Sequence, residues 1–104
     1  MSDLYRPYQK LIEVVILGRR FEVPENNLLL RQMQFVAPDI GFGKYCWNAE
    51  CRYCEITYRL PGGGPGVKGL ACMVPGQPGL CVIKVATEIR YNMAEALAAA
   101  PKLG

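Results

Sequence analysis

Residues 46–54 of the chain read CWNAECRYC. This stretch places Cys46, Cys51 and Cys54 at the spacing C-x4-C-x2-C, in a region with neither a helical nor a strand period. Three thiols from one irregular loop can wrap around a metal centre, and a fourth can come from elsewhere in the chain. A lone CxxC pair supports such a centre weakly, but the third and fourth cysteines make the pattern specific. We therefore expect a four-thiolate site, for which Cys72 and Cys81 are candidates as the fourth ligand.

The rest of the composition narrows the chemistry of that site. The 104-residue chain has five cysteines, an odd number that fits a disulfide framework poorly, and no histidine. The absence of histidine removes imidazole zinc ligands and the Ser-His and Cys-His nucleophilic pairs. Four-cysteine zinc sites favour two CxxC pairs, whereas this chain has one. A thioredoxin-like dithiol would need a surrounding βαβ pattern, which is missing. An iron–sulfur centre is favoured over zinc.

Charge and hydropathy exclude two classes of partner. The net charge of +3 is spread along the chain with no long basic run, so we expect no nucleic-acid binding. We also expect no membrane insertion, because no apolar stretch approaches the roughly 18 residues of a spanning helix. The first residues, 1–6, lack the apolar region of an export signal. These features predict a cytoplasmic protein, in a compartment where thiols stay reduced.

On the N-terminal side of the cysteine loop, the sequence predicts a hairpin and a helix. Residues 10–17 are rich in Leu, Ile and Val and predict a buried strand. Residues 18–20 suit a tight turn, and residues 21–23 predict a short returning strand. Residues 24–27, PENN, carry helix-start chemistry, with asparagine as the expected cap. A helix should follow, and Pro38 should end it because its ring disfavours helical geometry at Ala37.

The predicted helix has one apolar face. Leu29, Met33 and Val36 fall at i, i+4 and i+7, the spacing of a stripe that packs on a core. Arg31, Gln32 and Gln34 are expected on the rest of its surface.

On the C-terminal side, residues 55–60 predict a strand and the glycine-rich residues 61–66 a flexible connection. Cys72 comes just before a turn cluster at residues 75–79, and residues 80–86 predict a second buried strand. From Thr87, as a candidate cap, apolar residues recur at helical spacing and predict a C-terminal helix. The chain is expected to form one α+β domain over residues 1–104, with its core at about 10–86.

This pattern resembles the plant-type [2Fe–2S] ferredoxins. The shared features are the C-x4-C-x2-C spacing with a later cysteine, and the order hairpin, helix, cysteine loop, strand, cysteine before a turn, strand. Residues 14–29 also resemble the opening of ferredoxin-like domains in respiratory complex I and iron hydrogenases, and residues 70–75, LACMVP, are similar to the family's fourth-ligand segment. The resemblance implies a β-grasp fold, a mixed sheet with one packed helix.

The resemblance also implies a set of ligands. Cys46 and Cys51 would hold one iron, and Cys54 and Cys72 would hold the other. The interval from Cys54 to Cys72 is shorter than plant-type ferredoxins usually have, and Cys81 would stand nearer the usual distance. We choose Cys72 because it precedes a turn, where a side chain can be aimed, and interpret Cys81 as a small core residue of a strand.

The function implied is one-electron transfer by a [2Fe–2S] protein that donates to or accepts from an oxidoreductase, without catalysing a bond change itself. Two alternatives remain at this point. The chain could be a permanently bound electron-transfer or regulatory subunit of a larger oxidoreductase, or a non-redox β-grasp domain that binds zinc. The sequence leaves the redox partner and the oligomeric state open.

Overall fold

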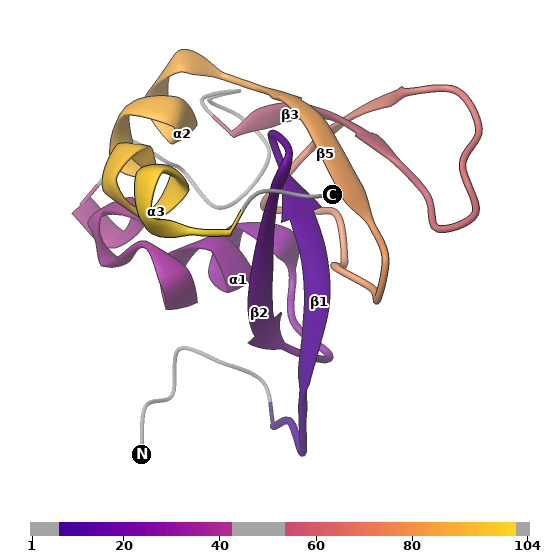
Figure 1. The fold of residues 1–104 in the computed structure, drawn as a ribbon, viewed down its shortest axis with the longest axis horizontal. Coiled ribbons are helices and arrows are strands. Elements are labelled where there is room, and N and C mark those ends of the chain that lie inside the picture. Colours follow the sequence, from indigo (N-terminus) through magenta and orange to yellow (C-terminus); the bar gives the residue numbers. More distant parts are fainter. Residues whose placement is uncertain (1–6, 43–53, 102–104) are drawn as a thin grey trace.

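The computed structural model describes residues 7–42 and 54–101 (Figure 1). Strands and helices are mixed along the chain, so the predicted α+β class is confirmed. The elements are β1 (Leu11–Ile16), β2 (Arg19–Pro24), α1 (Leu29–Val36), the 3-10 helix η1 (Pro38–Phe42), β3 (Glu55–Arg59), β4 (Val67–Leu70), β5 (Cys81–Val85), α2 (Thr87–Asn92) and α3 (Ala94–Ala99).

The strands form one five-stranded sheet in the order β2-β1-β5-β3-β4. β1 and β5 pair in parallel, and the other neighbours pair antiparallel, so the sheet is mixed. Strand β4 was not predicted. Its sequence, VKGL, has an interior glycine and no apolar alternation, and it is ordered by pairing with β3 along one side only.

The β1–β2 hairpin confirms the two predicted strands but corrects the turn between them. The turn residues are Leu17 and Gly18, both with positive φ (51° and 77°), rather than residues 18–20. Two consecutive residues with positive φ match the right-handed twist of the flanking strands. Arg19 and Arg20 consequently belong to β2, which makes that strand longer than predicted.

Helix α1 packs on the core through Leu29 and Met33, as predicted, whereas Val36 is only half-buried. The expected position of Gln32 is wrong, because its side chain is completely buried in the structure. Figure 1 shows α1, α2 and α3 gathered on the same side of the sheet. The buried side chains of sheet and helices form one contiguous cluster.

The predicted C-terminal helix is two short helices. The break is at Met93, whose φ and ψ of −102° and 5° end α2 and begin α3. Thr87 is not the cap, because Ala86 stands at that position and no side chain caps the helix. In the described part of the chain, no helix has both the length and the apolar character that crossing a membrane requires.

Candidate metal centre

Cys54 and Cys72 are brought together by the β3–β4 hairpin. Its ladder runs from the pair Tyr58–Val67 to the pair Glu55–Leu70. One further backbone hydrogen bond follows the ladder: the N–H of Ala71 donates to the carbonyl of Cys54 at 2.9 Å. Cys54 and Ala71 therefore face each other where the ladder ends, and Cys72 is the next residue along the chain.

Both thiols lie in the protein interior. Cys54 is 1% exposed and Cys72 is 2% exposed. The chain turns directly after β4, since the N–H groups of Met73 and Val74 both bond to the carbonyl of Leu70. This turn buries Cys72 and leaves the next side chain, Met73, 58% exposed. An irregular backbone can direct a side chain in this way, whereas in a regular strand the pleat fixes its direction.

The turn that carries Cys72 is attached to the start of helix α1. The N–H of Leu29 donates to the carbonyl of Val74 at 2.7 Å, and the N–H of Leu30 donates to the carbonyl of Ala71 at 2.9 Å. First-turn N–H groups have no partner within their own helix. Here the segment around Cys72 supplies the acceptors.

These bonds correct the predicted asparagine cap. The N-cap residue is Leu28, and no side chain caps the helix. The amide of Asn27 instead donates from Nδ2 to the carbonyl of Glu25 at 2.8 Å. A local pattern such as PENN cannot reveal that distant carbonyls will take the place of the cap.

Cys81 lies away from this arrangement. In the sheet it pairs with Val15 of β1 and with Arg59 of β3. Arg59 ends the strand that Cys54 immediately precedes, so Cys81 and Cys54 are separated by the length of β3, about 16 Å for an extended chain. Thiolates on one metal ion lie only about 4 Å apart, given metal–sulfur bonds near 2.3 Å. Cys81 is half-buried rather than a fully buried core residue.

The other two predicted ligands, Cys46 and Cys51, lie outside the described residues. Within residues 7–42 and 54–101, no three cysteine, aspartate or glutamate side chains are grouped as ligands for a metal ion. Within the described ranges, Cys54 and Cys72 thus lie at one end of β3 and Cys81 lies at the other.

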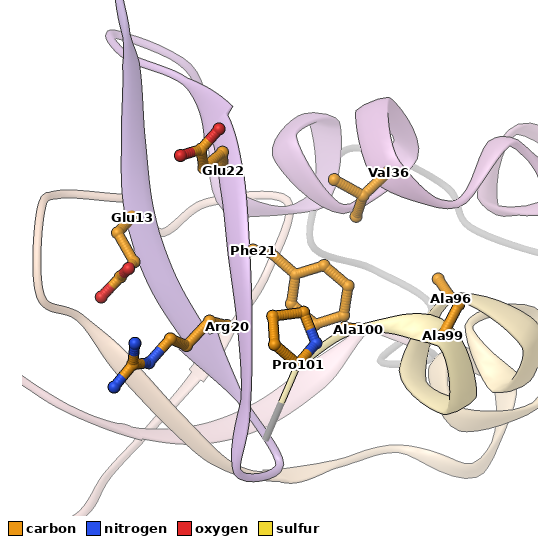
Figure 2. A pocket seen from close by; sticks show the side chains of 9 residues that line it. All are labelled: Glu13, Arg20, Phe21, Glu22, Val36, Ala96, Ala99, Ala100 and Pro101. Carbon is orange, nitrogen blue, oxygen red and sulfur yellow. The ribbon is translucent and has the colours of Figure 1, made fainter. Parts of the chain in front are cut away.

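A separate hollow of about 590 Å³ lies between β2, α1 and the C-terminal segment (Figure 2). Phe21 points from β2 toward Pro101, whereas Glu13 and Arg20 lie on the other side of the hairpin. No cysteine lines this hollow. Its apolar part is formed by Phe21, Val36, Ala96, Ala99, Ala100 and Pro101.

No protein-family model, curated protein or solved structure matches the chain. The likeness to plant-type ferredoxins therefore stays a prediction from the sequence.

The residues that hold the segment around Cys72 in place were not predicted from the sequence. They include Ala71, whose N–H and carbonyl both form hydrogen bonds, and Gln32, whose side-chain amide is buried. One signal was present for Gln32, which follows Leu29 by three residues and so lies near the apolar stripe. The backbone role of Ala71 leaves no trace in the sequence.

Proposed function

We propose that this chain binds one [2Fe–2S] cluster through Cys46, Cys51, Cys54 and Cys72 and serves as a one-electron carrier for an oxidoreductase. The observation that carries the proposal is the placement of Cys54 and Cys72 beside each other, both buried, where the β3–β4 ladder ends. When bound, such a cluster supplies a couple that accepts and releases single electrons.

The donor chemistry fits this group. Iron–sulfur clusters are held by cysteine thiolates, and the chain offers no histidine that would suggest a different metal. The burial of Cys54 and Cys72 keeps water from their sulfur atoms. Solvent access and hydrogen bonds to sulfur are among the main controls on the potential of such a centre. In this proposal the residues of the chain therefore bind the cluster and shield it from water, and none of them makes or breaks a covalent bond of a substrate.

The sheet order β2-β1-β5-β3-β4, with α1 packed against the hairpin, supports a β-grasp ferredoxin fold. The proposal includes a cytoplasmic location, because a reducing compartment keeps the thiols available for iron. The partner is an oxidoreductase that contacts the surface near Cys72, where the exposed Met73 offers an apolar contact.

The test is to purify the chain without oxygen, record its visible spectrum, and measure iron, sulfide and zinc in the same sample. We expect a red-brown protein with two irons and two sulfides per chain, whose colour bleaches with dithionite. The Cys81→Ser variant is the matched control and should have the same spectrum and iron content. A colourless protein with one zinc, or one that takes up no iron on reconstitution, would overturn the proposal.

A further inference from the structure

The side chain of Gln32 joins three parts of the fold from within the core. It is completely buried in α1. Its Nε2 donates to the carbonyl of Pro24, at the end of β2, at 2.9 Å and to the carbonyl of Gly76 at 3.4 Å. Its Oε1 has no hydrogen-bond partner among the described residues. Burying an amide with one half unpaired costs free energy, so a core position alone would favour an apolar side chain.

The amide of Gln32 occupies the space that a side chain at residue 76 would need. A Cβ atom at residue 76 would overlap Oε1 of Gln32, so no larger residue fits without moving that side chain. Gly76 is not among the described glycines with positive φ, so space rather than backbone conformation requires glycine there. Its N–H also donates to the carbonyl of Asn27 at 3.2 Å. Gly76 is thus held by both of its backbone polar groups.

The segment from Ala71 to Gly76 is consequently held by hydrogen bonds both before and after Cys72. Before the cysteine, Ala71 bonds to Cys54 and to Leu30. After it, Val74 accepts from Leu29, and residues 75 and 76 contact the chain just before α1. At the end of this segment, the side-chain amide of Gln32 donates to the carbonyl of Gly76 and so adds a contact from within α1.

We infer that Gln32 is a positioning residue for Cys72, which it holds in its buried orientation through Gly76. The inference rests on the proposed function, because the orientation matters to a cluster only if Cys72 is a ligand. The hydrogen bonds of Gln32 go to the carbonyls of Pro24 and Gly76 and not to the thiol of Cys72. It acts by preventing the segment after Cys72 from moving away from α1, and loss of such a supporting group weakens metal retention about ten- to hundredfold in known sites.

The first experiment compares iron release from loaded Gln32→Ala and Gln77→Ala proteins in the presence of a chelator. Gln77 is the matched control because it follows Gly76 directly and its side chain is exposed. We expect Gln32→Ala to release iron about tenfold faster than wild type. Gln77→Ala should stay within about twofold of it, as is usual for surface substitutions. Visible circular dichroism of the loaded Gln32→Ala protein should also change, because the direction of one ligand changes.

The second experiment separates a local effect from a general loss of stability. The rates at which iodoacetamide modifies Cys54, Cys72 and Cys81 are measured in the iron-free chain by mass spectrometry. For Gln32→Ala we expect Cys72 to react about tenfold faster, with Cys81 unchanged as the internal reference. Acceleration of all three thiols together would mean that the whole fold is weakened and would overturn the positioning role.

A compensating pair tests the contact itself. Gly76→Ala should speed iron release about tenfold, because its methyl group displaces the Gln32 amide. In the double variant Gln32→Ala/Gly76→Ala the three heavy atoms nearest to the added methyl group are absent, so release should match that of Gln32→Ala alone. A rate near the product of the two single effects, about a hundredfold, would show that the two residues act independently and overturn the inference.

The outcomes also distinguish this inference from the proposed function. A wild-type chain that takes up no iron would overturn the proposed function and the role of Gln32 with it. A wild-type chain that loads two irons, with Gln32→Ala releasing them no faster than Gln77→Ala, would overturn the positioning role alone.

Discussion

Cys72 and Cys81 are close in sequence but lie toward opposite ends of β3 and are held in different ways. Cys81 sits inside a ladder, between β1 and β3, where the pleat of the sheet fixes its direction. Cys72 sits in a turn outside the ladder, and helix α1 holds that turn through two backbone hydrogen bonds. The first thiol is half-buried and the second is almost completely buried.

The difference shows what a ligand position needs. An irregular backbone lets a side chain point where a strand could not, but it must be fixed by contacts outside the turn. The Cys72 end of β3 has such contacts, from α1 and from Cys54. The Cys81 end instead adjoins the connection Pro61–Gly66, where three successive glycines, Gly62, Gly63 and Gly64, have positive φ. We expect substitutions at the two ends to have different consequences for iron and for stability.

The largest expected difference is between serine substitutions of the two cysteines. Cys72→Ser should lower iron retention by at least about a hundredfold, since loss of a supporting residue alone can cost that much. Cys81→Ser should leave iron content, spectrum and midpoint potential unchanged. Iron and sulfide analysis of both variants after gel filtration checks this. Loss of iron from Cys81→Ser, with Cys72→Ser fully loaded, would reverse the assignment of the fourth ligand.

The sequence was sufficient to predict the strands β1, β2, β3 and β5 and the helix α1. The expected burial of β5 was wrong, because only Val82 of that strand is buried. The sequence also favoured Cys72 over Cys81 as a ligand from local context, and this choice stays a prediction; the structure pairs Ala71, the residue before Cys72, with Cys54. The other errors come from contacts between elements. The cap of α1 and the burial of Gln32 depend on residues far away in the chain, whereas β4 depends on its pairing with the preceding strand, β3.

Those distant contacts converge on one place, the segment from Ala71 to Gly76. Nothing in LACMVPG shows that two of its carbonyls accept from a helix start, or that its glycine makes room for an amide. The cysteine spacing thus predicts a set of ligands, whereas only the structure shows which distant residues contact the segment that carries Cys72.

A smaller effect is expected from leucines at the two ends. Leu30 is completely buried, and its N–H bonds to Ala71, whereas Leu60 is 48% exposed beside the glycine connection. Leu30→Ala should cost about 2–5 kcal/mol in free energy of unfolding, the range for a buried leucine. Leu60→Ala should cost less than about 0.5 kcal/mol, as for other surface positions. Urea unfolding followed by far-ultraviolet circular dichroism measures both. Equal losses would mean that the two ends are equally well packed.

The smallest effect is expected from substitutions of Gly79, at the Cys81 end of β3. Gly79, just before β5, has a φ of 84°, and a Cβ there would lie 3.3 Å from Cβ of Pro61. Gly79→Ala should therefore cost about 1–2 kcal/mol, because alanine resists the left-handed conformation. Gly79→Asn, the matched variant, should cost less, since asparagine adopts that conformation more readily. Neither should change iron content, because the N–H of Gly79 donates to the carbonyl of Glu13 in β1 rather than to the segment that carries Cys72. If Gly79→Ala lowered iron retention as strongly as Gly76→Ala, the two ends of β3 would be coupled, and the independence argued from their separate contacts would be wrong.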